Sequence, residues 1–224
     1  SGHLSALFVN KLQIRQGKIF YRDKRLFPGP GPLIIDSLDF TLEDISVAQP
    51  IAVTLAADLM ATGRQNLHGK GTLGPVGESL RIKEMPFDGN LTLQKLVLDR
   101  LESRLPEGTH MKGPVGLKVT FAGTPQKFQF AVDADMKALE IQHRNLFRKP
   151  GQTLLSFTCR GVKEGPQITC NALELAFHNL VVSASTPWSI NPEKSQFDGT
   201  AQIRVASLSG WDALVPGLSG CDLE

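Results

Sequence analysis

The sequence predicts a mainly β protein: a strongly bent antiparallel sheet, forming an open groove or a partly closed barrel or sandwich, with two short helices. Two observations predict this class. Apolar and polar residues alternate at period two in segment after segment, which gives each strand one apolar and one polar face. Turn residues, mostly glycine and proline, separate these segments. We therefore expect roughly a dozen strands, with boundaries good to ~3 residues.

The alternating segments define the expected strands in chain order. Residues 8–22 are predicted to form two strands that reverse at Gly17, and the proline-rich run 27–32 is predicted to be a loop. Residues 42–48 and the basic stretch 144–152 are predicted connections. Further strands are expected over 33–44, 50–60, 111–123, 127–141, 153–160, 167–176, 178–186 and 196–206.

The period changes to that of a helix in two places. Residues 98–105 place leucines at a spacing of three to four, with charged residues between them, and Pro106 ends the pattern. Residues 208–215 form the second helical candidate, with Trp211 and Leu214 directed inward. Helices this short do not hold alone in water, so we expect both to pack as lids or plugs on the apolar side of the sheet.

Composition argues against a nucleic-acid partner. The 224 residues include 24 basic and 22 acidic side chains, and the formal charge of +2 is too balanced for a nucleic-acid-binding surface. The local basic residues Arg144, Arg148 and Lys149 are interpreted as solvated loop charge.

Residues 1–224 are predicted to form a single β-rich region, with a possible sub-boundary near residue 87. No apolar run approaches the ~20 residues that cross a bilayer. The ends, Ser1-Gly2-His3 and Leu223-Glu224, look like vector scars. We therefore expect a fragment of a longer repeating β protein, from which a membrane anchor could have been removed.

Cysteine and histidine spacing predicts no metal site and no cofactor. The chain has three cysteines without a CxxC pair, and its five histidines do not fall at ligand spacing. Cys159 and Cys170 flank a predicted turn at 161–166, and counting outward from that turn places their sulfurs opposite each other. A cross-strand bond and two buried free thiols both remain open.

No residue pattern indicates catalysis, so we do not expect an enzyme. The glycines of segment 66–74 lie in an alternating run without a following helix, which favours a bulge or bend over a phosphate loop. Asp133 and Asp135 share the polar face of a predicted strand and are interpreted as solvated. The aromatic residues are mostly phenylalanine, which is typical of cores and hydrocarbon sites rather than sugar or base stacking.

Four passages resemble motifs of the AsmA-like proteins of Gram-negative envelopes. Residues 12–23 match the strand pair L-x-I-x-x-G-x-ϕ-x-Y-x-D, where ϕ is apolar. Residues 128–141, followed by Lys149-Pro150-Gly151, are similar to the family's strand and Lys-Pro-Gly loop. Residues 173–182 resemble L-x-L-x-ϕ-x-N-L-x-ϕ-x-ϕ, and residues 197–211 resemble the end of a family repeat.

The resemblance implies a periplasmic protein anchored in the inner membrane, whose repeated β segments form a long groove. Such proteins are thought to carry phospholipid between the two membranes or to influence outer-membrane assembly. The implied partners are phospholipid acyl chains and envelope proteins. The family brings no catalytic residues, and the chain departs from it in lacking an amino-terminal membrane helix and in being short.

We expect acyl chains to contact the apolar faces of three predicted strands. About a dozen one-sided strands present more apolar surface than two short helices can cover, and each buried methylene contributes ~0.8 kcal/mol. The candidate lipid-contacting residues are Ile51, Val53, Leu55, Val115, Leu117, Val119, Phe128, Phe130 and Val132.

Three other interpretations stay open. The same alternation is compatible with a sealed sandwich core. A lipid-free β domain could instead pair an exposed edge strand with a partner protein, as an interaction module of the cell envelope. A glycan hydrolase would need paired carboxylates, for which Asp133 and Asp135 are the available candidates.

Overall fold

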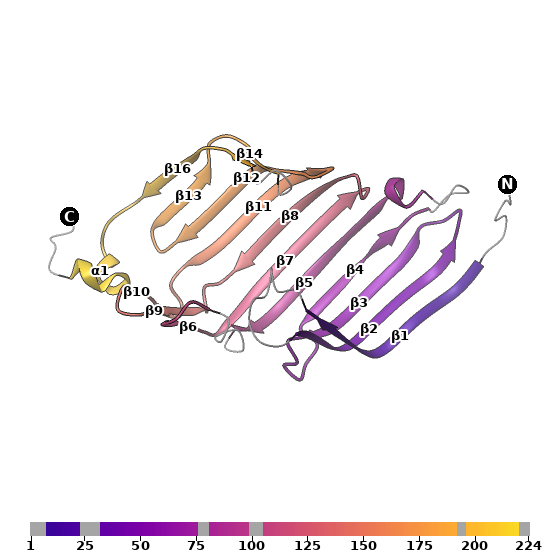
Figure 1. Ribbon diagram of the computed structural model, residues 1–224, viewed down its shortest axis with the longest axis horizontal. Coiled ribbons are helices and arrows are strands. Elements are labelled where there is room, and N and C mark those ends of the chain that lie inside the picture. The colour runs from indigo at the N-terminus through magenta and orange to yellow at the C-terminus, as the bar shows by residue number, and fades with distance from the viewer. Residues whose placement is uncertain (1–7, 23–31, 76–80, 99–104, 192–195, 220–224) are drawn as a thin grey trace.

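The computed structural model describes residues 8–22, 32–75, 81–98, 105–191 and 196–219, and most of these form one large antiparallel sheet (Figure 1). In a branch off this sheet, β14 (Trp188–Asn191) pairs both with β12 (Gln167–Phe177) and with β15 (Gln196–Asp198). The predicted mainly β class is confirmed. The main path runs β1 (Phe8–Tyr21), β2 (Leu33–Ser46), β3 (Ile51–Leu59), β4 (Leu67–Leu73), β5 (Phe87–Val97), β7 (Pro114–Gly123), β8 (Lys127–Asp135), β11 (Leu155–Glu164), β12 (Gln167–Phe177), β13 (Leu180–Ala184) and β16 (Ala201–Val205).

A second sheet of three strands continues the β7–β8 hairpin. It contains β6 (Thr109–Lys112), β9 (Glu140–His143) and β10 (Phe147–Lys149), in the order β10-β9-β6. The sequence prediction merged β6 with β7 and β9 with β8, and placed β10 in a loop. Gly113, with φ of 108°, turns the chain between β6 and β7, and such a turn leaves little trace in the alternation of residue types.

The pairing register carries one apolar face across the large sheet. Thr54 and Lys118 are examples of the polar residues at alternate positions, which face the opposite side. The apolar side chains of neighbouring strands therefore lie on the same face of the sheet, as expected from the alternation along each strand. One row across six strands consists of Leu55, Gly69, Leu91, Val119, Val132 and Cys159.

The described strands form an open sheet rather than a closed barrel or a sealed sandwich. No second layer covers the apolar face of β3 to β8 within the described ranges, and the apolar side chains of β7 and β8 are only half-buried. The described apolar side chains that are buried are Ile51, Ala57, Leu93, Leu139, Cys159, Cys170, Ala176 and Leu214.

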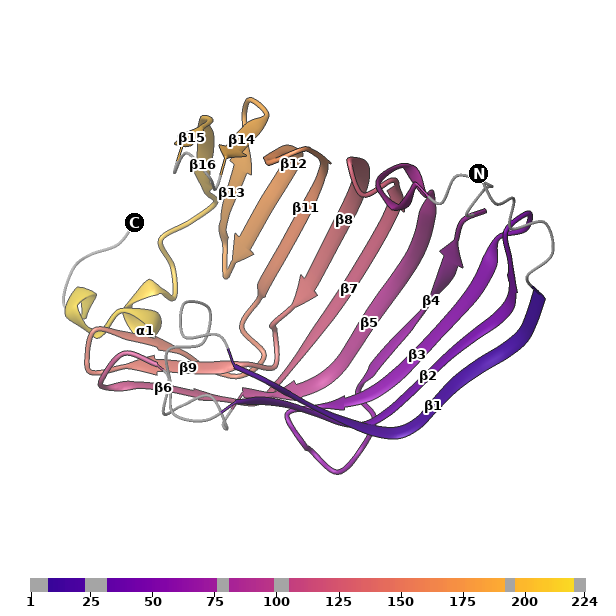
Figure 2. The same ribbon diagram turned by 45° about the vertical axis from the view of Figure 1, so that its right-hand side comes forward.

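The large sheet bends where bulges interrupt several of its strands. The register shifts near Gln16 in β1, Ser37 in β2 and Lys95 in β5, and these residues have φ of 51°, 49° and 53°. Bulges increase local bend and twist. The upper parts of the strands consequently form a wall, while their lower parts run toward the small sheet as a floor (Figure 2).

Gly17 does not reverse the chain, so the predicted strand pair at 8–22 is wrong. Strand β1 continues through the Gln16-Gly17 bulge and pairs along its length with β2. The Gln16 backbone N–H donates to Asp39 Oδ1 at 3.0 Å, which satisfies the donor that the bulge releases from the ladder. A similar extension carries β2 to Ser46, beyond its predicted end.

One of the two predicted helices lies within the described residues and is confirmed in location, although it is shorter than the predicted 208–215. Helix α1 (Trp211–Leu214) is followed by the 3₁₀ turn η3 (Pro216–Leu218), and Leu214 is buried as expected. The helix predicted at 98–105 falls mostly on residues 99–104, outside the described residues. A further 3₁₀ turn, η1 (Ile82–Glu84), precedes β5. Among the described helices, none is long and apolar enough to cross a membrane.

Candidate functional site

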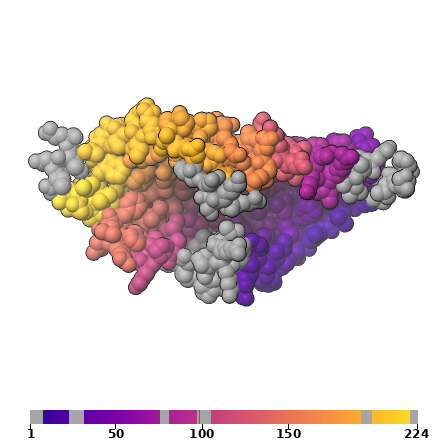
Figure 3. Space-filling model, turned by 45° about the horizontal axis from the view of Figure 1, so that its top comes forward, coloured from indigo at the N-terminus to yellow at the C-terminus, as the bar shows by residue number. Residues whose placement is uncertain are grey.

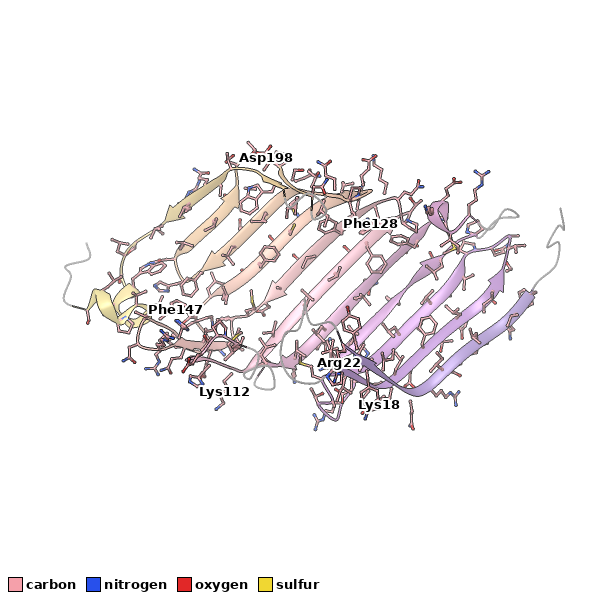
Figure 4. All side chains as sticks on the ribbon, viewed as in Figure 1. Lys18, Arg22, Lys112, Phe128, Phe147 and Asp198 are labelled. Carbon is pink, nitrogen blue, oxygen red and sulfur yellow. The ribbon has the colours of Figure 1, made fainter. Side chains whose placement is uncertain are left out.

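The concave side of the bent sheet carries the apolar face, and we call this surface the apolar trough. It is formed by the apolar faces of β3, β4, β5, β7, β8, β11 and β12. Figure 3 shows it as a shaded hollow between the orange and yellow strands of the upper margin and the pink strands of the small sheet. In Figure 4, Phe128 lies near the upper ends of the strands, and Lys18, Arg22, Lys112 and Asp198 lie at the outer edges of the molecule.

All nine residues predicted to contact lipid lie on this one face. Val119 is directly opposite Val132, and the alternation along β3, β7 and β8 places the other seven on the same side. They do not form one cluster, because β4 and β5 separate β3 from β7. The nine residues therefore mark two parts of one continuous surface.

The sequence prediction missed the residues that link these two parts. Gly69 and Gly71 of β4, with Leu91 of β5, lie between Leu55 and Val119 on the apolar face. A hollow of about 130 Å³ lies here, and its apolar wall includes Phe40. The sequence analysis placed these glycines in an alternating run but did not count them among the apolar-face residues, because glycine has no apolar side chain.

The two glycines of β4 let the neighbouring strand approach the trough floor closely. A Cβ at Gly69 would lie 2.6 Å from Leu91 Cδ2, and a Cβ at Gly71 would meet the backbone oxygen of Asp88. These positions therefore require glycine for close packing. The segment pairs with β3 and β5 without a register shift, so the predicted bulge is absent from β4. The segment is strand β4 and contains no phosphate-binding loop.

Phenylalanine side chains gather at the upper margin of the trough. Phe87 lies with its ring centroid 5.7 Å from that of Phe121 and 5.5 Å from that of Phe128. Phe128 in turn lies 6.5 Å from Phe130 in an edge-to-face arrangement. Apolar rings at these separations attract each other and offer a hydrocarbon surface without polar groups.

The Lys163 ammonium lies beside this phenylalanine cluster. Lys163 of β11 is opposite Phe128 of β8, and its Nζ lies 5.6 Å from the centre of the Phe128 ring. Lys163 Nζ also donates to the Gly165 carbonyl oxygen at 2.7 Å. The trough margin thus combines an apolar floor with a positive charge near its edge.

The opposite, convex face is polar and contains the two candidate carboxylates. Asp133 lies opposite Lys118 and Thr158 in the strand register. Asp135 Oδ1 accepts a hydrogen bond from the Lys137 backbone N–H at 3.0 Å. Both aspartates are exposed, as expected for a solvated strand face. Two further hollows, of about 420 and 600 Å³, lie along β5, β7, β8, β11 and β12. The lining of the larger one combines polar residues such as Lys118 and Asp133 with Val115 and Leu117.

Helix α1 packs at the carboxyl-terminal end of the trough. The ring centroid of Trp211 lies 5.7 Å from that of Phe177, and Phe177 lies 5.6 Å from Phe147. The Trp211 Nε1–H donates to Asn179 Oδ1 at 2.7 Å, which fixes the indole. The expectation that this helix packs on the apolar side is confirmed, because Phe177 belongs to the apolar face of β12.

Lys149 is buried, so its interpretation as solvated loop charge is wrong, whereas Arg144 and Arg148 are exposed. Only 1% of Lys149 is accessible. Its Nζ donates to the carbonyl oxygens of Lys137 at 3.0 Å, Pro150 at 3.3 Å and Leu139. Burial lowers the pKa of Lys149, and the nearby carboxylates of Glu140 and Asp135 oppose this. Lys149 therefore has a structural role at the junction of β9 and β10.

The described residues contain no group of three His, Cys, Asp or Glu side chains placed to hold a metal ion. Comparison of the chain with models of protein families, with curated proteins and with solved structures gives no match.

Proposed function

We propose that this chain is a periplasmic segment of an AsmA-like protein and binds phospholipid acyl chains in the apolar trough. It would take part in lipid transport and outer-membrane biogenesis as a carrier surface rather than as an enzyme. The observation that carries the proposal is the continuous apolar face, which spans β3 to β12 and has no covering layer among the described residues. Anchoring of the full-length protein in the inner membrane is part of the proposal and follows from the family resemblance alone.

Energetics support hydrocarbon as the ligand. An uncovered apolar surface in water is unfavourable, and contact with acyl chains removes it from water at about 25 cal/mol per Å². Each methylene of the chain gains ~0.8 kcal/mol on the same scale. A binding partner that is itself apolar along its length therefore fits the trough better than a compact polar molecule does.

The length of the trough supports transport rather than capture of one tail. The trough comprises the seven neighbouring strands from β3 to β12, and at a spacing of ~4.8 Å these extend for about 30 Å. One leaflet of a bilayer has a hydrocarbon depth of about 15 Å, half of the ~30 Å core. An acyl chain would therefore occupy one part of the trough at a time and could slide along it.

Lipid that copurifies with the protein tests this proposal. The chain is expressed in a Gram-negative host, purified without detergent, and analysed by native mass spectrometry and by organic extraction. We expect bound phospholipid, and we expect stripped protein to take up a fluorescent fatty acid. Protein that carries no phospholipid and also fails to take up the probe would contradict the proposal.

The exposed edge strand β1 favours a second candidate, a protein-interaction module of the cell envelope. β1 pairs only with β2 among the described strands, and Phe8, Leu12 and Ile14 on it are exposed. An unpaired edge offers backbone donors and acceptors to a strand of another protein. Lipid-free protein that binds an envelope protein, and loses it when proline replaces Gln13 in β1, would support this candidate over the carrier.

A further inference from the structure

Cys159 and Cys170 are brought together by an irregular part of the β11–β12 hairpin. The hairpin turns tightly at Gly165, later than predicted, so Cys170 lies opposite Gly161. A bulge then shifts the register, and Cys159 lies opposite Leu173. The two cysteines are therefore diagonal neighbours on one face of the hairpin, and the expectation that they lie directly opposite is wrong.

The absence of a side chain at Gly161 lets the strands come close beside the cysteines. A Cβ at this position would lie 3.1 Å from the Cys170 Cα and would also meet the Thr169 backbone oxygen. Diagonal positions of a regular antiparallel pair are usually ~7 Å apart, which is wide for a disulfide. The bulge and the close approach at Gly161 together bring this pair within reach.

The two sulfur atoms are in contact and almost fully buried. Cys159 Sγ lies 2.9 Å from Cys170 Sγ, and the residues are 4% and 6% exposed. Val132 of β8 and Trp188 of β14 flank the pair as register partners. Both residues are free thiols in this structure.

We propose that Cys159 and Cys170 form an intramolecular disulfide that links β11 to β12 when the protein meets a disulfide oxidant. With a low-molecular-weight disulfide such as oxidised glutathione, one protein thiolate attacks and forms a mixed disulfide. The second protein thiolate then displaces glutathione. Two protein thiols lose two protons and two electrons in total, and one glutathione disulfide becomes two glutathione thiols.

The reaction should be slow at neutral pH. Burial raises the pKa of Cys159 to about 12, and the hydrogen bond with Cys170 acts in the same direction. Whichever cysteine reacts first, the other must attack as a thiolate, so Cys159 has to ionise on either route. The oxidation rate should therefore rise about tenfold per pH unit below that pKa.

The experiment uses the whole chain with Cys221→Ser, so that only the proposed pair remains. Folded protein is incubated with oxidised glutathione across a pH series, quenched with acid, alkylated in denaturant, and analysed by intact mass and non-reducing peptide mapping. We expect a loss of two hydrogens, no alkylation, and one linked peptide that contains both cysteines. We also expect a higher melting temperature after oxidation, since a cross-link restricts the unfolded chain.

Single variants provide the matched controls. Cys159→Ser and Cys170→Ser should each retain one thiol, which is either alkylated or joined to glutathione. If these variants fail to fold, the mass and peptide map of the Cys221→Ser protein still decide the question. Two alkylated thiols after prolonged oxidation at high pH, or disulfides only between chains, would overturn the proposal. Neither result depends on whether the trough binds lipid.

Discussion

Lys163 and Phe128 face each other across β11 and β8, and the Lys163 ammonium lies 5.6 Å from the centre of the Phe128 ring. Lys163 is the only charged residue among the described, register-paired positions on the apolar face of β3 to β12. Lys127 lies one step away in the register, pairs with Glu164 at 3.0 Å, and is directed away from the trough. The two lysines therefore lie close together but on opposite faces of the sheet, Lys163 on the apolar face and Lys127 on the polar face.

The first prediction is that Lys163 favours lipids with anionic headgroups. Lys163→Glu should lower the preference for an anionic over a zwitterionic phospholipid by about two- to fivefold, the range expected for an exposed ion pair. Lys127→Glu should leave the preference unchanged. Lipid exchange from vesicles of each composition, at low salt, measures the ratio. Equal effects of both variants would assign the preference to overall charge.

The second prediction compares two adjacent residues on opposite faces of β7. Val119→Asp places a carboxylate between Leu91 and Val132 in the trough, whereas Thr120→Asp places it between Asn90 and Ala131 on the polar face. A carboxylate among acyl chains costs several kcal/mol, so Val119→Asp should weaken acyl-probe binding at least ~tenfold. Thr120→Asp should bind as the parent does. Circular dichroism must show that both variants are folded. Unchanged probe binding by Val119→Asp would show that acyl chains do not contact this part of the trough.

The one-sided sheet could be predicted from the sequence because a period of two is a local property. Val119 and Val132 were placed on one face by alternation alone, and the register confirms it. The floor at Gly69 and Gly71 was missed for the same reason: glycine has no side chain to continue the pattern, although its backbone occupies the same face.

Features set by distant residues could not be predicted. The bulge at Gln16 depends on Asp39, 23 residues further along the chain, and without that partner the local pattern indicates a turn. Lys149 similarly finds its acceptors on Lys137 and Leu139, which reach it only after β9 and β10 pair. Charge in a short basic run carries no local sign of such burial.

The third prediction concerns the close approach of β4 and β5. Gly71→Ala should destabilise the protein by about 1–3 kcal/mol, because the added methyl meets the rigid backbone oxygen of Asp88. Gly69→Ala should have a smaller effect, since the Leu91 side chain can move away from the new methyl. Urea denaturation of both variants measures the difference. A Gly69→Ala effect as large as that of Gly71→Ala would contradict the packing argument.

The fourth prediction is that Lys149 stabilises the β9–β10 junction through its three carbonyl acceptors. Lys149→Met keeps most of the volume but removes the ammonium donor from all three oxygens. The Lys137 and Pro150 oxygens keep backbone donors, the N–H groups of Gln152 and Thr153. We expect a loss of about 1–3 kcal/mol in the free energy of unfolding. Arg148→Met, at the exposed neighbouring position, should change it by less than about 0.5 kcal/mol. Thermal and urea unfolding of the pair provide the measurement, and similar losses in both variants would refute the specific role.

The fifth prediction concerns acid sensitivity at the bend between β1 and β2. The pKa of Asp39 is lowered by the hydrogen bond from the Gln16 backbone N–H, and the Gln65 side-chain amide adds to this at 2.8 Å. The pKa of the neighbouring Asp36 is lowered by its contact with Lys18 at 2.7 Å. Because the folded pKa values lie below the unfolded ones, stability is fully present above pH ~4 and is lost as the pH falls through the folded values.

A neutral isostere at Asp39 should remove this part of the acid dependence. Asp39→Asn retains an oxygen for the Gln16 N–H but does not ionise, so its melting temperature should fall less than that of the parent between about pH 4 and pH 2. Glu43→Gln, which neutralises a carboxylate paired with Lys11 in a regular part of the same strands, is the control and should follow the parent closely. If Asp39→Asn and the parent lose stability in parallel on acidification, the charge of the carboxylate does not stabilise the bulge. The Asp39 oxygen then contributes only by accepting the hydrogen bond of the Gln16 N–H.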